Sequence, residues 1–175
     1  MLRNLFRRRP NERQGDALYA LAVEQARQPA FYTTLGVADR IDARFELYTL
    51  HVLILFLRLK GDGERGEVAA QKLFDTYVSS LDHTLRELGV GDVSVGKKMR
   101  KLGESLYGRM NAYEGPLRAE DIDTLAVSLA KNIFESADVE TGRALARYAV
   151  ASRQNLATQS FDTVSKAPVW AEITA

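Results

Sequence analysis

The residues DRIDARFELYTLHVLILFLRLKGDG, at positions 39–63, decide the fold of this chain. Wound as an α-helix, this segment has apolar side chains on two opposite sides: Ile41, Phe45, Tyr48, Val52 and Leu59 on one, and Leu47, Leu50, Ile54 and Leu57 on the other. A helix that is apolar on two sides is usually buried. The segment therefore predicts a central helix about 30 Å long, with Asp39 as its N-cap and Gly61 and Gly63 beyond its last turn.

Five further segments carry apolar residues at helical spacing, and no stretch alternates as a strand would. They span about residues 14–28, 64–88 and 93–113, then a segment that opens at Glu120 and one that begins behind Asp138. We expect Gly89 to stop the helix at 64–88, and Gly115-Pro116 to break the chain after the next one. Residues 30–38 form a link, and the last fifteen residues show no clear period.

The expected fold is therefore all-α, with a single compact helical domain of about six helices at residues 14–157. A basic segment, residues 1–10, precedes this domain. An irregular tail, residues 158–175, follows it and contains Trp170, whose role stays open.

Composition limits the class of protein. Of the 175 residues, 46% are apolar and 27% are charged, which is typical of a soluble globular protein. Cysteine is absent, so disulfides, thiolate catalysis and sulfur-ligated zinc are excluded. The longest apolar run, 47–57, is shorter than the roughly 20 residues that cross a bilayer. A net charge of +1 gives no global attraction to nucleic acid, and we expect no specific DNA binding.

The sequence offers no clear catalytic or cofactor site. His51 lies in the apolar central run, where we expect a core histidine with one hydrogen bond, and His83 is expected on the surface beside Asp82. Neither belongs to a HExxH or Glu-x-x-His motif, and no GxSxG motif is present. Residues 91–97 match GxxxxGK, but Lys98 replaces the Ser or Thr of a phosphate-binding loop, and a helix precedes them. We predict a protein that is not an enzyme and has no cofactor.

Local charge is more informative. Lys97, Lys98, Arg100 and Lys101 gather at the start of a helix, where cations oppose the helix dipole. They form either a solvated face or a site for an anionic partner such as RNA, an acidic protein or a lipid headgroup. A second basic patch lies at the N-terminus, beside Leu2 and Leu5. Its predicted contacts to an anionic membrane surface are Arg3, Phe6, Arg7, Arg8 and Arg9, against the alternative of a solvated terminus.

Several short motifs occur in a recognisable order. They are ARQPAFY at 26–32, LGV at 35–37, DARFEL at 42–47, His51, LRELGVGD at 85–92, KKM at 97–99, and LYGR at 106–109 ahead of Tyr113. Together they resemble the ubiquinol–cytochrome c chaperone family, over about residues 17–150.

The resemblance implies an assembly chaperone for ubiquinol–cytochrome c reductase (complex III, the cytochrome bc1 complex) that binds newly made cytochrome b. It leaves open a second assembly factor and the ribosome as further partners. The chain lacks the long N-terminal extension of mitochondrial members, which favours a bacterial relative, peripheral at the cytoplasmic face of the inner membrane. The alternative is a general RNA- or ribosome-binding helical protein that uses its basic face.

The predicted partner-binding residues fall in three groups. Phe31 and Tyr32, in the link, and Tyr107 are aromatic residues that either pack in the core or dock an apolar helix. Arg44, Arg86 and Arg109 lie in the matched motifs, and each either contacts the partner or forms an ion pair within the bundle. Lys97, Lys98 and Lys101 belong to the basic cluster.

Overall fold

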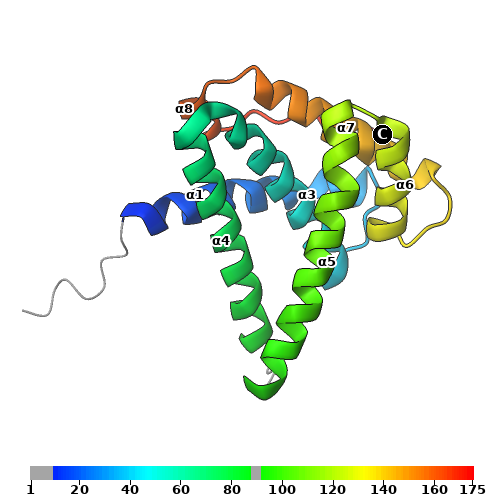
Figure 1. Ribbon diagram of the computed structural model, residues 1–175. Coiled ribbons are helices and arrows are strands. Elements are labelled where there is room, and N and C mark those ends of the chain that lie inside the picture. Colours follow the sequence, from blue (N-terminus) through cyan, green and yellow to red (C-terminus); the bar gives the residue numbers. More distant parts are fainter. Residues whose placement is uncertain (1–9, 88–91) are drawn as a thin grey trace, which may run out of the picture.

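A computed structural model describes the main chain at residues 10–87 and 92–175, where it is helical and contains no strand (Figure 1). The helices are α1 (Pro10–Ala26), α2 (Pro29–Thr33), α3 (Ile41–Leu59), α4 (Gly63–Glu87), α5 (Asp92–Ala119), α6 (Ile122–Ile133), α7 (Glu140–Ala157) and α8 (Phe161–Val164), with a 3-10 turn, η1 (Lys60–Asp62), after α3. The all-α prediction is confirmed. The expected stop at Gly89 lies outside the described residues.

Helix α3 is the centre of the fold, as predicted. Leu47, Leu50 and Ile54 are fully buried, and α1, α4, α5, α6 and α7 all pack against this helix. Because burial of apolar surface is the main favourable term in folding, the buried apolar side chains of α3 hold the surrounding helices together. Ile41 is an exception, because it is the first residue of the helix and is 67% exposed.

The N-cap of α3 lies one residue later than predicted, at Arg40 in place of Asp39. Arg40 occupies the N-cap position, with an extended backbone and no capping side chain. Asp39 does not cap the helix because its carboxylate Oδ1 accepts a hydrogen bond from Nε of Arg44, at 2.6 Å. The Asp39 carboxylate therefore connects the residues just before α3 to the first turn of the helix through Arg44.

The predicted break at Gly115-Pro116 is wrong, since α5 continues through Pro116 to Ala119. A proline ring clashes with the Cβ of the preceding residue when that residue is helical, and Gly115 has no Cβ. The continued helix also places Leu117 in the core with no exposed surface. The turn to α6 follows at Glu120, whose φ is +57°, and Asp121 caps α6 by accepting a hydrogen bond from the Thr124 N–H at 3.0 Å.

Helices α4 and α5 converge away from the rest of the molecule and meet at their joined ends (Figure 1). We call residues 79–87 and 96–105 the arm. None of its side chains is fully buried, and the apolar Leu81, Leu85, Met99 and Leu102 are half-buried. The apolar stripes predicted for both segments therefore extend beyond the main core, and there their side chains stay partly exposed to solvent.

Residues 158–175 pack against the helical domain, although their sequence shows no helical period. Ser160 caps the short α8 by accepting a hydrogen bond from the Thr163 N–H, and Val164 is fully buried. Further on, the Trp170 ring lies 5.2 Å from the ring of His51, edge to face. The tail thus packs on the central helix, although only four of its residues are helical.

Candidate partner-binding surface

Two of the predicted partner-binding residues, Tyr32 and Arg44, line one open groove of about 350 Å³ between α2 and the start of α3. We call this the Tyr32 groove. Its lining residues are Arg27, Pro29, Tyr32, Thr33, Asp39 and Arg44. Pro29 begins α2, a position that proline suits because its φ is already helical. The link between α1 and α3 therefore forms one wall of the groove.

Hydrogen bonds hold the polar groups of this groove in place. The Tyr32 hydroxyl donates to the Ala26 carbonyl at 3.3 Å, and Arg27 Nε donates to the Tyr48 hydroxyl at 2.8 Å. The hydrogen bond from Arg44 lowers the pKa of Asp39, while burial raises the pKa of Tyr32. At neutral pH the groove thus presents two guanidinium groups, one carboxylate and a neutral phenol.

Arg109 forms an ion pair with Glu46 within the helical domain. Its Nε donates to both carboxylate oxygens of Glu46, at 2.9 and 3.2 Å, and Tyr113 donates to Oε2 at 3.5 Å. Glu46 is only 5% exposed, and burial raises its pKa, whereas Arg109 and Tyr113 act to lower it. The pair joins α5 to α3. The sequence prediction overlooked this role of Glu46, although a charged residue in an apolar helix was a signal for it.

Phe31 lies in the core with no exposed surface, so a partner cannot reach it in this structure. Its ring is 5.1 Å from that of His51 and 5.0 Å from that of Tyr148, both edge to face. The neighbouring Tyr32 is half-buried and keeps contact with the groove. Of the two aromatic residues in the link, only Tyr32 is placed where it can meet a partner.

His51 is a core histidine, as expected, and makes two hydrogen bonds where one was predicted. Burial lowers its pKa from 6.5 to about 4, so the ring is neutral at pH 7. Nδ1 donates to the Leu47 carbonyl at 2.7 Å, and Nε2 accepts from the Tyr148 hydroxyl at 2.9 Å. Gln25 in turn donates to Tyr148 at 3.0 Å. This chain of hydrogen bonds connects α1, α3 and α7.

The remaining predicted residues lie along α4 and α5. Arg86, on the arm, donates to Asp82 at 2.8 Å, which is the local ion pair that the sequence left open. Lys97, Lys98 and Lys101 are exposed on the other side of the arm, and no ion pair among the described residues involves them. Tyr107 follows on α5 and is 69% exposed. The arm thus brings Arg86 and the three lysines to one end of the molecule, separate from the Tyr32 groove.

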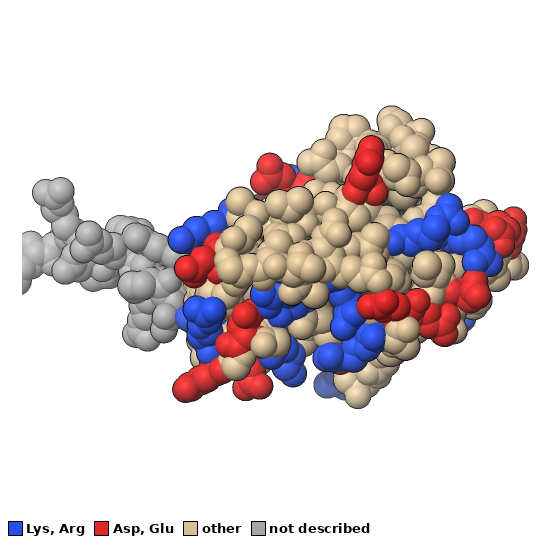
Figure 2. All heavy atoms as spheres, turned by 90° about the horizontal axis from the view of Figure 1, so that it is seen from above, with Lys and Arg blue, Asp and Glu red and all other residues tan. Residues whose placement is uncertain are grey.

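Figure 2 looks at the molecule from above the view of Figure 1, on the side away from the end of the arm. On this face, acidic and basic side chains are interspersed around an uncharged centre. Such a face has no extended positive field for a polyanion.

The predicted membrane contacts, Arg3, Phe6, Arg7, Arg8 and Arg9, lie outside the described residues. Within the described part, no cluster of three or more acidic or histidine side chains could hold a metal, and no helix has the length and hydropathy of a membrane span.

The comparisons with known proteins agree with one another. The sequence profile of the family described as ubiquinol-cytochrome C chaperone matches residues 33–170. The chain belongs to this family. The match includes Trp170, which lies beyond the region that the motifs indicated and packs on the central helix of this family member.

Two relatives extend the comparison. Ubiquinol-cytochrome-c reductase complex assembly factor 1 from Xenopus laevis is 22% identical over 117 residues, which cover 67% of this chain and 58% of that protein. The crystal structure of the Cbp3 homolog from Brucella abortus is 32% identical, with a TM-score of 0.82, and the match covers 93% of this chain and 91% of that one. The fold of that solved structure therefore extends over nearly the whole of this chain.

Proposed function

We propose that this protein is a non-enzymatic assembly chaperone for ubiquinol–cytochrome c reductase and that its client is newly made cytochrome b. The observation that carries the proposal is the family match over residues 33–170, together with a structural similarity that covers 93% of the chain. The Xenopus laevis relative is named as an assembly factor for this complex. The chain spans 58% of the length of that relative.

The arm is the proposed client-binding element. Leu85, Met99 and Leu102 of the arm are only half-buried, so part of each side chain can contact an apolar helix, and methionine adapts to irregular surfaces. The exposed Lys97, Lys98 and Lys101 lie near Met99 and Leu102 along α5 and suit acidic groups at the end of a client helix. The Tyr32 groove and the exposed Tyr107 provide further contacts. A cytoplasmic position, peripheral at the inner membrane, fits a client that enters the bilayer.

Complementation of a deletion strain tests the proposal. Loss of the b-type haem signal of complex III from the membranes, with other respiratory complexes intact, is the expected result of deletion. Wild-type protein should restore the signal. Normal spectra with altered translation would overturn the proposal and support the RNA- or ribosome-binding alternative.

The arm is tested in the same strain with Lys97→Glu/Lys98→Glu/Lys101→Glu. The fold should persist, because the three side chains are exposed and substitutions at exposed positions usually change stability little. This variant should fail to restore the signal and should capture less cytochrome b in pull-downs at low salt. The matched control reverses three exposed cations on other elements, with the same change in charge: Lys131→Glu/Arg147→Glu/Lys166→Glu. If both variants restore complex III fully, the arm lysines do not bind the client.

A further inference from the structure

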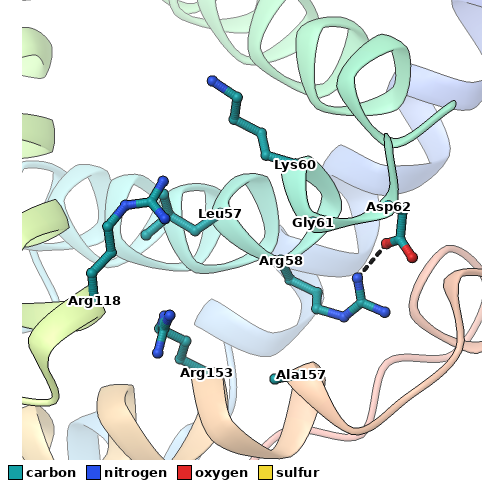
Figure 3. A pocket seen from close by; sticks show the side chains of 8 residues that line it. All are labelled: Leu57, Arg58, Lys60, Gly61, Asp62, Arg118, Arg153 and Ala157. Carbon is teal, nitrogen blue, oxygen red and sulfur yellow. Dashed lines mark hydrogen bonds and ion pairs between the residues drawn. The ribbon is translucent and has the colours of Figure 1, made fainter. Parts of the chain in front are cut away.

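A second, larger groove lies where the end of α3 and the η1 turn meet α5 and α7 (Figure 3). It has a volume of about 630 Å³. Its lining residues are Leu57, Arg58, Lys60, Gly61, Asp62, Arg118, Arg153 and Ala157. Four of these are cations and one is an acid, so cations predominate in the lining of the groove.

One cation of this groove is already fully engaged. Arg58 pairs with Asp62, and the two side chains are only 10% and 16% exposed. Its Nε donates to the Leu156 carbonyl at 2.7 Å, and another nitrogen donates to the Gln159 carbonyl. Arg58 and Asp62 therefore form a fixed, neutral pair that joins α3 to the end of α7, and they leave the positive charge of the groove to the other three cations.

Arg118 and Arg153 supply that charge at the groove itself. They come from α5 and α7 and reach toward the end of α3 (Figure 3). Nε of Arg118 contacts Glu114 at 2.9 Å on the open surface, and Arg153 lies 3.7 Å from Glu120, beyond hydrogen-bond range. Each guanidinium has five N–H donors, so most of them remain available to a ligand in the groove.

Lys60 connects this groove to a smaller one. The second groove, about 350 Å³, is lined by Phe56, Lys60, Glu67, Val68, Ala70 and Gln71. The Lys60 ammonium lies 5.3 Å from the centre of the Phe56 ring, and Val68 is 47% exposed. A site with guanidinium groups on one side of Lys60 and apolar side chains on the other matches a molecule that has an anionic head and an apolar part.

We propose that the larger groove is a binding site for a phosphate group, held by Arg118 and Arg153, on an anionic lipid headgroup or a small phosphate ester. Arg118 and Arg153 line the same groove, and a guanidinium group can bind the oxygens of a phosphate by bidentate hydrogen bonds, which an ammonium does not provide. The site lies apart from the arm and the Tyr32 groove, so the inference goes beyond the proposed client binding and does not depend on it.

Titration of the full-length protein tests this site. The probes are inorganic phosphate and monomeric dihexanoyl phosphatidylglycerol, with dihexanoyl phosphatidylcholine as the zwitterionic comparison. Binding is measured at low salt by calorimetry and by the NMR signals of the arginine Nε–H groups. Arg118→Gln/Arg153→Gln should weaken binding of both anionic probes by at least about tenfold, since each lost charge-assisted hydrogen bond is worth about that factor.

Control variants separate this effect from general charge. Lys131→Gln/Arg147→Gln removes the same charge from exposed positions, with Arg147 six residues before Arg153 on the same helix, and should bind the probes as the wild type does. Arg118→Gln alone, at a side chain 49% exposed, keeps the test valid should the double variant unfold.

The two probes also distinguish the sources of the phosphate. Phosphatidylglycerol binding more tightly than phosphate would support a lipid headgroup, and equal binding would support a small phosphate ester. The proposal is overturned if neither anionic probe binds, or if the variants at Arg118 and Arg153 bind as tightly as the control.

Discussion

Replacing Arg109 by methionine should destabilise the protein most at neutral pH and little near pH 4. The substitution removes the hydrogen bonds of Arg109 to Glu46 and leaves the carboxylate with only the Tyr113 hydroxyl at 3.5 Å. Methionine retains much of the apolar stem of arginine. The change therefore acts mainly on the buried charge.

The size of the effect follows from the burial of the two partners. Breaking a buried ion pair by removing one partner costs about 3–5 kcal/mol. Here Glu46 is nearly buried, but the Arg109 side chain is 30% exposed, so water already screens part of the interaction. We expect a loss of about 2–3 kcal/mol at pH 7, which for a protein of this size lowers the melting temperature by about 5–10 °C.

The pH dependence has a definite sign. Burial raises the pKa of Glu46 above its ordinary value of 4.5, and Arg109 opposes that rise, so the variant has a still higher folded pKa. A raised carboxyl pKa contributes stability that is present below 4.5 and is lost as pH rises through the folded value. The difference from wild type should therefore grow from pH 4 to pH 8.

Urea denaturation at pH 4, 5.5, 7 and 8 measures this difference. Adding Glu46→Gln to Arg109→Met should recover part of the stability at pH 7, because the neutral amide needs no cation. A loss that does not change with pH, or a double variant less stable than Arg109→Met alone, would refute the assignment of the effect to the buried Glu46 carboxylate.

Three further predictions concern the core. Ile54→Ala should cost about 2–5 kcal/mol in thermal denaturation, while Ile41→Ala, at a residue 67% exposed, should stay within about 0.5 kcal/mol of wild type. The pKa of His51 falls from 6.5 to about 4 on folding, so wild-type stability should decrease as pH falls from 6.5 toward 4, and His51→Gln should remove that part of the pH dependence in urea titrations. Trp170→Ala should cost about 2–3 kcal/mol in the same assay, with Val169→Ala, 61% exposed, as its neutral comparison; equal stability of the two would show that the tail is not part of the core.

Local pattern predicted most of the helices, and the differences have local causes as well. The break expected at Pro116 is absent, and Gly115, which has no Cβ, relieves part of the clash between a proline ring and a helical residue before it. Asp39 failed as an N-cap because Arg44 engages its carboxylate. Proline usually ends a helix and aspartate often begins one. At Pro116 and at Asp39, a nearby residue changed that outcome.

The candidate binding sites were harder to predict from the sequence. Tyr32 and Arg44 are close in sequence and proved to share a groove. By contrast, Arg118 and Arg153 carry no common motif, and they meet only because α5 and α7 both pack near the end of α3. Residues so far apart in sequence come together through helix packing, which periodicity does not encode.

By itself, the sequence determined the helical class, the buried central helix and the core position of His51, because helical spacing of apolar residues specifies which sides of a segment avoid water. Only the tertiary structure decided that Phe31 is buried while Tyr32 is half-exposed, that Glu46 needs Arg109, and that Trp170 packs on His51. The physical reason is that burial of a particular side chain depends on which surfaces of distant segments meet, and that is settled by packing rather than by local pattern.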